Sequence, residues 1–337
     1  MRLYLAAQSS LELIRHLRCI NGAEGLEGVT LRKRQMNDAI NTARGINELD
    51  ATAQFLLGHV SRPIHAYVRD RSMKANAKIL HTHVFSGAIP AGCFLDLGHG
   101  LCICTPQFAF LQLSAQSNPV EMMKLGMELC GSFSRPPIPT IRVSGFVEEG
   151  VSCTYDLPPV AHARLLRLFV ERMAGQRGAV NARKAVKYLV DGAASPMEAA
   201  IYLMLCLPKR VGGYGLPKPT LNPKIIIKNP AGSTTIERYP DLFWEGANID
   251  VEYNSDESHS GEWSRYRDSR REVELTVADV RVLPLTRHQL MDADGFDEFA
   301  QGLRRMLGIR TRPEDPQWQN RRGDLRRALL SADGQTA

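Results

Sequence analysis

The sequence has no long apolar run, and none of its hydrophobic stretches reaches the roughly 18 residues that a membrane-spanning helix needs. Its first apolar stretch is interrupted by Glu12, Arg15 and Arg18, which is wrong for a signal peptide and typical of a surface helix. We therefore expect a cytoplasmic protein without a membrane partner.

Cysteine is scarce and odd in number, with seven residues that lie mostly in apolar segments. This pattern favours buried, reduced thiols over a disulfide framework. Cys102 and Cys104 form a C-x-C pair with His99 nearby, which raises the alternative of a zinc site. No second cysteine pair accompanies it, so a buried strand is the favoured interpretation.

Lysine is absent from Arg281 to the last residue, although the net charge of the chain is +6. Arginine clusters there instead, as Arg304, Arg305, Arg310, Arg312, Arg321, Arg322, Arg326 and Arg327. Guanidinium groups suit bidentate contacts with phosphate. A solvated helix face is the alternative explanation.

The length of 337 residues predicts about two domains. Prolines in the segment SRPPIPT break helical structure and place a boundary between about residues 133 and 160. We expect a mixed α/β domain over 1–133, a linker and helical segment over 134–194, a second domain over 195–310 and an arginine-rich tail over 311–337. The first domain shows hydrophobic runs but no cluster of catalytic residue types.

The second domain has an ordered pattern. SPMEAAIYLMLCLP predicts a helix that is capped by Ser195 and opened by Pro196. PKIIIKN, TTIERYPDLFW and ANIDVEYN predict three strands, and GEWSRYRDSRREVEL predicts a helix. DVRVLPLT predicts a fourth strand, and RHQLMDADGFDEFAQGLRRMLG a closing helix. The order α-β-β-β-α-β-α predicts a mixed sheet of about four strands, flanked by helices, with a right-handed crossover.

Two carboxylates stand out by position. Asp241 follows Pro240 at the end of one predicted strand, and Glu252 lies within the next. Alternation along a strand places Asp250, Glu252 and Asn254 on one face, where polar groups are costly unless solvated, paired or bound to metal. Asp241 and Glu252 are thus candidate ligands of Mg²⁺ or Mn²⁺. The alternative is a polar sheet edge with surface carboxylates.

Residues 195–310 resemble the nuclease-like domain of relatives of the very-short-patch repair endonuclease, within the PD-(D/E)XK superfamily. The matching features are Pro240–Asp241, the strand Val251–Asn254, the downstream His259, the D-x-x-R helix of Asp268 and Arg271, and the strand that ends near Thr286. The helix SPMEAAIYL resembles the one that opens the family's domain, whose glutamate corresponds to Glu198. The resemblance implies a restriction-endonuclease-like fold in which Asp241 and Glu252 bind metal and Glu198 assists.

One position departs from the family pattern. The superfamily's lysine corresponds to Asn254, which cannot supply a positive charge. His259 is a candidate substitute as acid or base, although a histidine in a polar loop is usually only solvated. Arg270 and Arg271 are candidate nucleic-acid contacts, with a salt bridge between Asp268 and Arg271 as the alternative.

The N-terminal region carries a second, shorter likeness. HTHVFSGAIPAGCFLDLGHGLCICTPQFAFLQLSAQ, with Thr105–Pro106, Phe110 and Leu113, resembles the layout of AbiEi-type antitoxins and regulators. Together the two resemblances imply a metal-dependent nuclease that hydrolyses phosphodiester bonds in DNA. The alternatives are a non-catalytic nucleic-acid-binding regulator with a degenerate nuclease fold and an antitoxin-like protein with a cognate toxin as partner.

Overall fold

The computed structural model describes residues 1–22, 26, 29–30, 36–85, 89–136, 153–228, 235–254, 279–310 and 316–330 of the chain. The chain divides into two compact units, unit 1 (Met1–Leu189) and unit 2 (Val190–Ala337). The division falls after the helices of the 134–194 segment, so that segment belongs to unit 1 as far as Leu189. Each unit has its own sheet and its own buried core.

Unit 1 is built on a mixed sheet. Its described strands are β1 (Leu3–Leu5), β2 (Val29–Thr30), β3 (Ile64–Val68), β4 (Leu80–Val84), β5 (Phe94–Asp96) and β6 (Leu101–Cys104). They lie in the order β2-β5-β6-β1-β3-β4, so β4 is at one edge of the sheet. The β1–β6 and β3–β4 pairs are parallel and the other pairs antiparallel.

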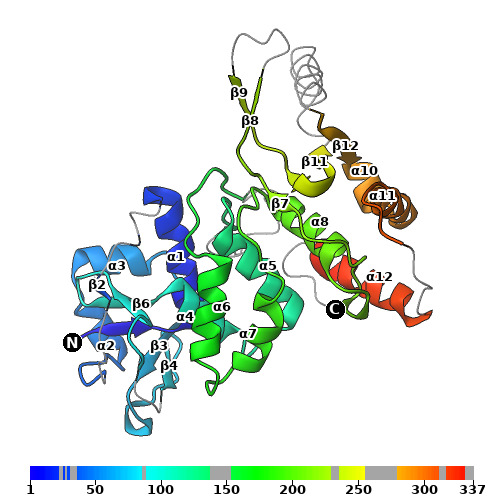
Figure 1. The fold of residues 1–337 in the computed structure, drawn as a ribbon. Helices are drawn as coiled ribbons and strands as arrows, with labels where there is room; N and C mark the ends of the chain where they lie inside the picture. The colour runs from blue at the N-terminus through cyan, green and yellow to red at the C-terminus, as the bar shows by residue number, and fades with distance from the viewer. Residues whose placement is uncertain are drawn as a thin grey trace, which may run out of the picture. The chain divides into compact units, whose positions relative to one another are not determined.

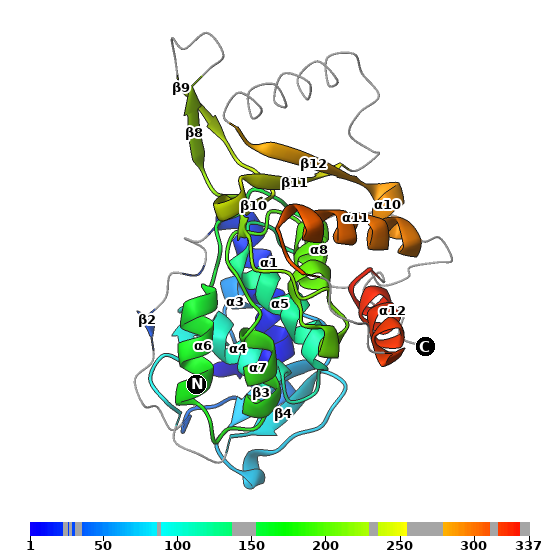
Figure 2. The same ribbon diagram turned by 45° about the vertical axis from the view of Figure 1, so that its right-hand side comes forward.

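Helices cover this sheet. They are α1 (Ala7–Asn21), α2 (Ala43–Asn47), α3 (Ala51–Leu57), α4 (Pro106–Leu113), α5 (Pro119–Cys130), α6 (Ala163–Arg172) and α7 (Ala179–Val186), with the short 3₁₀ turn η2 (Arg71–Met73). α1 and α4 pack against the strands and each other, and α5, α6 and α7 pack around α4 (Figures 1 and 2). The predicted α/β class and the strand predicted around Cys102 and Cys104 are confirmed.

Local sequence explains where two of these helices begin. Thr105 caps α4 by accepting a hydrogen bond from Phe108, with Pro106 in the first turn. Asn118 and Glu121 form a reciprocal capping box at the start of α5. Such caps satisfy backbone N–H groups that the first helical turn leaves without partners.

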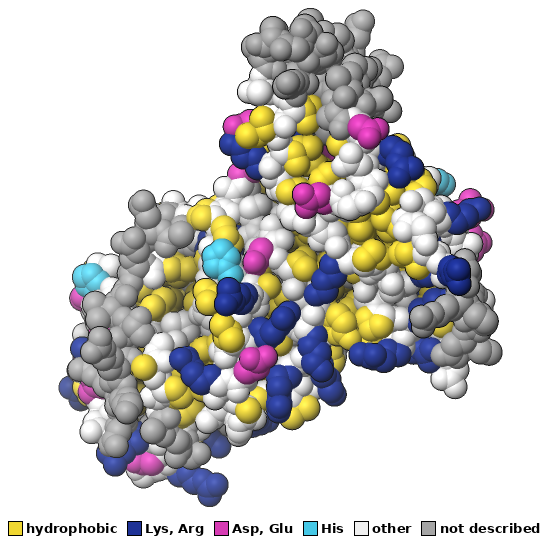
Figure 3. Space-filling view, in the orientation of Figure 1, with side chains coloured by type: hydrophobic (Ala, Val, Ile, Leu, Met, Phe, Trp, Pro, Cys, Tyr) yellow, Lys and Arg dark blue, Asp and Glu magenta, His cyan; other side chains and the backbone are white. Residues whose placement is uncertain are grey.

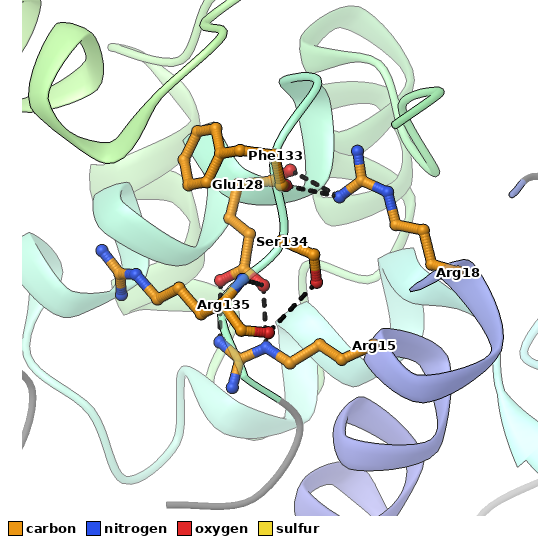
Figure 4. A network of polar contacts seen from close by, with 6 residues as sticks. All are labelled: Arg15, Arg18, Glu128, Phe133, Ser134 and Arg135. Atoms are coloured by element: carbon orange, nitrogen blue, oxygen red, sulfur yellow. Dashed lines mark hydrogen bonds and ion pairs between the residues drawn. The ribbon is translucent and has the colours of Figure 1, made fainter. Parts of the chain in front are cut away.

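A buried arginine joins α1 to the end of α5 (Figure 4). Arg18 is only 1% exposed. Its guanidinium donates to four backbone carbonyls, those of Glu128, Gly131, Phe133 and Pro158. The last carbonyls of a helix have no intrahelical donors, so Arg18 satisfies groups that burial would otherwise penalise.

Glu128 forms the second part of this network. Arg15 donates to both oxygens of its carboxylate at 2.7 Å, and the backbone N–H of Arg135 donates at 3.2 Å (Figure 4). Burial alone would raise the pKa of Glu128, but the charge and hydrogen bonds of Arg15 hold it below its usual value. Arg15, which the sequence analysis placed on a surface helix, therefore links α1 to the buried Glu128 of α5.

The C-x-C pair lies in a buried strand. Cys102 and Cys104 are both 0% exposed in β6. Burial raises the pKa of the Cys102 thiol to about 12, so it stays protonated and is a poor metal ligand. His99 pairs instead with Asp50 at 2.6 Å. These contacts support the favoured interpretation over a zinc site.

The described part of unit 2 contains four helices and six strands, and the strands form a four-stranded and a two-stranded sheet. The helices are α8 (Pro196–Cys206), α10 (Arg287–Met291), α11 (Ala293–Met306) and α12 (Pro316–Leu330), with the 3₁₀ turns η3 (Lys209–Val211) and η4 (Glu245–Ala247). The strands are β7 (Thr220–Leu221), β8 (Ile225–Lys228), β9 (Thr235–Arg238), β10 (Leu242–Trp244), β11 (Ile249–Asn254) and β12 (Arg281–Thr286).

The main sheet of unit 2 has the order β12-β11-β10-β7. β10 is antiparallel to both β7 and β11, whereas β11 and β12 are parallel. One face is apolar and fully buried at Leu242, Ile249 and Val251. The predicted mixed sheet flanked by helices is thus confirmed.

Three predicted elements differ in detail. The strand predicted over TTIERYPDLFW is two strands, because Pro240 lacks the N–H that a continuous ladder needs. β8 pairs with β9 in a separate two-stranded sheet, and β7 takes the fourth place in the main sheet. The closing helix is interrupted at Asp292, whose side chain caps α11.

None of the helices in the described ranges is long and apolar enough to cross a membrane.

Candidate functional site

The β10–β11 pair brings the two predicted metal ligands together. Leu242 lies opposite Val251 in this antiparallel register. Continued one step beyond the start of β10, this register sets Asp241 against Glu252. Directly opposed residues of an antiparallel pair have their Cβ atoms about 5 Å apart. The two carboxylates therefore start from neighbouring positions at the same end of the hairpin.

The backbone around Asp241 fixes its orientation. Pro240 ends the ladder before it, and the carbonyl of Asp241 accepts a hydrogen bond from the Asn222 N–H at 3.1 Å. Its Oδ2 accepts a hydrogen bond from the N–H of Tyr253 at 2.9 Å. The Asp241 carboxylate thus lies against β11, next to Glu252, rather than pointing away from the sheet.

Glu198 comes from the first turn of α8. Ser195 caps this helix by accepting a hydrogen bond from the Glu198 N–H. The Glu198 carboxylate accepts hydrogen bonds from the Ala194 N–H at 2.9 Å and from Asn222 Nδ2 at 2.6 Å. The side chain is only 7% exposed. These hydrogen bonds fix the orientation of the Glu198 side chain at the start of α8.

Electrostatics link Glu198 to Glu252. Burial raises the pKa of Glu198, and the charge of Glu252 adds to this increase. Hydrogen bonds from Ala194, Asn222 and Ser195 act in the opposite direction. The net pKa of Glu198 is raised, chiefly because its carboxyl group is buried.

Asn222 is a site residue that sequence reasoning missed. It lies opposite Asp241, has a left-handed backbone conformation, and bridges Glu198 to the carbonyl of Gly192. The dipeptide Asn222–Pro223 is the only local signal, and it indicated a turn. Gly192 is also needed here, because a Cβ at its φ of +92° would meet the Leu221 carbonyl oxygen at 2.5 Å.

Two further residues of β11 complete the picture. Asp250 is 0% exposed and lies on the same face as Glu252, as predicted from strand alternation. Asn254, at the family's lysine position, is exposed at the end of the strand. The site is therefore rich in carboxylates, and its strand supplies no positive charge where the family pattern has one.

The donor set suits a hard cation. Asp241 and Glu252 offer oxygen ligands, and Mg²⁺ commonly takes one or two carboxylates with waters and phosphate. In the described ranges, no set of three or more His, Cys, Asp or Glu side chains is arranged as a metal-binding group. What the described residues offer is two carboxylates on neighbouring strands, with Glu198 near enough for its pKa to respond to Glu252.

Other candidates fall elsewhere. His259, Arg270 and Arg271 lie outside the described residues, as do Asp268 and the predicted helix that carries it. Of the tail arginines, several are engaged within unit 2. Arg304 is buried and donates to the Tyr214 carbonyl, Arg322 pairs with Asp297, and Arg326 donates to the Leu290 carbonyl. These three stabilise the unit and are not available as phosphate ligands.

Unit 1 holds a cluster that the sequence analysis did not predict. His65, His81 and His83 stack on one another beside Tyr67, and together they line a cavity. The prediction that this region has no group of catalytic residue types is therefore wrong. The signal was the H-x-H spacing in β4, which places two imidazoles on one face of a strand.

Comparison with known proteins adds no relative. No family model matches the chain, and neither the curated proteins nor the solved structures include a significant match.

Proposed function

We propose that unit 2 is a metal-dependent nuclease domain that hydrolyses phosphodiester bonds in DNA. The observation that carries this proposal is the placement of Asp241 opposite Glu252 across the β10–β11 pair, with Glu198 close enough for its pKa to respond to the charge of Glu252. The α8-then-sheet arrangement is also the one that the resemblance to the very-short-patch repair branch of the PD-(D/E)XK superfamily implies. That resemblance remains part of the proposal.

The residues present fit a divalent cation. Asp241 and Glu252 would hold Mg²⁺ or Mn²⁺, and Glu198 would assist directly or through water. When bound, such an ion supplies positive charge where negative charge develops on a phosphate. Without it, close carboxylates at one end of a sheet would repel one another. Burial is the main cause of the raised pKa of Glu198, and the charge of Glu252 adds a smaller part.

The protein's own groups have separate tasks in this mechanism. Hydrolysis adds water across a P–O bond, so the attacking water loses a proton and the leaving oxygen gains one. Burial raises the pKa of Glu198 above that of an ordinary carboxyl group, which favours proton exchange at this position. His259 is the proposed acid or base on the other side of the reaction. Arg270 and Arg271 would contact the DNA backbone. We place this activity in the cytoplasm, where the free cysteines would stay reduced.

Asn254 favours a second candidate function. Because β11 ends in a neutral, exposed side chain where the family pattern has lysine, unit 2 could bind nucleic acid without cleaving it. In that case the protein is a regulator, or an antitoxin-like partner of a cognate toxin. Nicking of a supercoiled plasmid with and without Mg²⁺ separates the two functions, since only the nuclease produces Mg²⁺-dependent nicks.

Metal binding has a sharper test that does not need the right substrate. Glu252→Gln removes a charge from the site, whereas Glu245→Gln removes one from an exposed position on η4. A ligand present at ten times its dissociation constant adds about 1.4 kcal/mol to stability. For a domain of this size that raises Tm by about 3–6 °C. Calorimetric scans should show this Mg²⁺-dependent shift in the wild type and Glu245→Gln, but not in Glu252→Gln. Equal shifts in all three proteins would contradict a role for Glu252 as ligand.

A further inference from the structure

The histidine cluster of unit 1 is formed by the parallel pair of β3 and β4. His65 lies opposite His81, and Tyr67 lies opposite His83. Because side chains alternate along a strand, all four rings lie on the same face of the sheet. β4 is the edge strand of this sheet and lies next to β3 in Figures 1 and 2.

The rings form a flat array. The centroids of His81 and His83 are 4.8 Å apart with 13° between their planes, and those of His65 and His83 are 5.2 Å apart with 18°. Nδ1 of His65 and Nε2 of His83 are 2.9 Å apart, so one imidazole donates a hydrogen bond to the other. The array therefore has a fixed orientation and presents ring faces and ring nitrogens.

This array is one wall of a cavity of about 950 Å³. The volume is in the range of small-molecule sites, which run from about 300 to 1,000 Å³. Three cationic side chains also line it, namely Arg71, Lys74 and Arg177. No Asp or Glu is among the described residues that line the cavity. A cavity lined by cations and by no carboxylate favours an anionic occupant.

Two of the imidazoles, those of His65 and His83, have pKa values below the usual value of histidine. The pKa of His83 is lowered to about 4. Burial is the largest cause, and the neighbouring histidines, Lys74 and Arg177 contribute the rest. Burial also lowers the pKa of His65, against a small opposing effect of Glu12 on α1. Tyr67 keeps its proton and donates to Gln112 at 2.7 Å. The fixed positive charge of the cavity therefore comes from Arg71, Lys74 and Arg177, while His65 and His83 contribute neutral aromatic rings.

We propose that this cavity is a mononucleotide-binding site, in which Arg71, Lys74 and Arg177 hold the phosphate and the histidine array stacks against the base. Charged guanidinium and ammonium groups are the usual phosphate ligands of proteins. Neutral aromatic rings stack with bases, whatever the sequence of the nucleic acid. The start of α1, at Ala7 and Gln8, also lines the cavity and adds the favourable N-terminal end of a helix.

Isothermal titration of the full-length protein with AMP, GMP, CMP and UMP tests this site. Adenosine and inorganic phosphate serve as the two halves of the ligand. We expect at least one monophosphate to bind more tightly than either half. The site does not depend on the nuclease activity proposed for unit 2, so it should bind equally well in the Glu252→Gln variant.

Two substitutions locate the binding. Lys74→Gln removes a charge that lines the cavity, and Lys78→Gln removes a charge from an exposed position that does not line it. Loss of one charged hydrogen bond weakens affinity by about tenfold or more. His81→Ala removes a stacking surface and should weaken it by about fivefold or more. Lys78→Gln should bind as the wild type does.

The outcome is decisive in either direction. Circular dichroism checks that each variant keeps its fold, and both lysines are exposed, so neither substitution should disturb it. The proposal is overturned if none of the four monophosphates binds, or if Lys74→Gln and Lys78→Gln bind equally well. Binding of a 5′-phosphorylated oligonucleotide without binding of any mononucleotide also overturns it.

Discussion

Glu198 shows how one buried carboxyl can report on a whole site. It lies in the first turn of α8, is held by hydrogen bonds from Ala194 and Asn222, and responds to the charge of Glu252. Its carboxyl oxygens accept hydrogen bonds, but burial makes the charged form unfavourable and raises its pKa. This combination is common where a protein tunes a group for chemistry, although structural networks produce it as well.

The raised pKa of Glu198 makes the stability of unit 2 depend on pH. Between the ordinary carboxyl pKa and the raised value, the folded state binds more protons than the unfolded state, so stability falls as pH rises through that interval. Glu198→Gln removes this titration. In metal-free buffer, its Tm should gain on that of the wild type as pH increases from about 4.5 toward neutrality. Thermal scans across this range check the prediction, with the exposed Glu245→Gln as control. A difference between wild type and Glu198→Gln that is constant with pH would contradict it.

Among the helices, α5 depends on a residue from a distant part of the chain. Arg18 on α1 donates to the carbonyls of Glu128, Gly131, Phe133 and Pro158. Arg18→Met keeps the apolar stem but leaves these carbonyls buried without their donors, at a cost of about 3–5 kcal/mol. Arg44→Met is the control, because Arg44 is 89% exposed and pairs only with Glu48 one turn away, for which the cost is at most about 0.5 kcal/mol. Thermal unfolding followed by circular dichroism should show a large loss for the first variant and almost none for the second.

α12 is an integral element of unit 2, although its sequence suggested an arginine-rich tail. Trp318 is 2% exposed, donates its indole N–H to the Gly213 carbonyl, and stacks edge-on with Tyr214. Trp318→Ala should destabilise unit 2 by about 3–5 kcal/mol. Arg327→Ala, at a side chain that is 78% exposed, should change stability by less than about 0.5 kcal/mol. If Trp318→Ala costs no more stability than Arg327→Ala, then α12 does not depend on its tryptophan.

How far the sequence predicts these elements depends on the range of the interactions that form them. The helix at Ser195 and the strand around Glu252 follow from local signals, namely caps, proline and apolar alternation, and both were predicted. The strand break at Pro240, just before Asp241, also has a local cause, because proline lacks the N–H that a continuous ladder needs. The positions of Asn222 and the burial of Trp318 were not predictable in this way. Both depend on contacts across the fold, from Asn222 to Gly192 and from Trp318 to Gly213.

The histidine cluster shows the same limit from the other side. The H-x-H spacing of His81 and His83 in β4 is visible in the sequence. Nothing local to β4 indicates that β3, which carries His65, pairs with it in parallel. Sequence reasoning predicted that Asp241 and Glu252 lie on neighbouring strands, because a hairpin joins residues close in the chain. It missed the imidazoles because a parallel pair requires a crossover, whose partner is set by the whole sheet.

At the scale of the whole molecule, charge is unevenly divided between the two units. Unit 1 has 22 Lys and Arg against 14 Asp and Glu, a net +8, and unit 2 has 20 against 22, a net −2. Within unit 1, residues 163–187 contain seven basic residues and only Glu171 as an acid. Lys and Arg side chains gather over the face formed by α6 and α7 (Figure 3). This face has the charge that a DNA backbone requires, and the carboxylate-rich unit 2 does not.

If the protein acts on DNA as proposed, this distribution predicts that the α6–α7 face contributes most of the electrostatic attraction, in addition to Arg270 and Arg271. Each phosphate that the protein neutralises contributes about −0.9 to the slope of log affinity against log salt. A triple variant on the α6–α7 face, Arg164→Gln, Arg183→Gln and Lys184→Gln, should weaken binding of duplex DNA and make this slope shallower. The matched control removes three exposed charges elsewhere in unit 1, with Arg44→Gln, Arg62→Gln and Lys78→Gln. Fluorescence anisotropy across a salt series measures both quantities. Glu252→Gln should leave the slope unchanged, because it alters the proposed cleavage site and not the basic face. If both triple variants weaken binding equally, attraction depends only on net charge, and α6 and α7 do not form the DNA-binding surface.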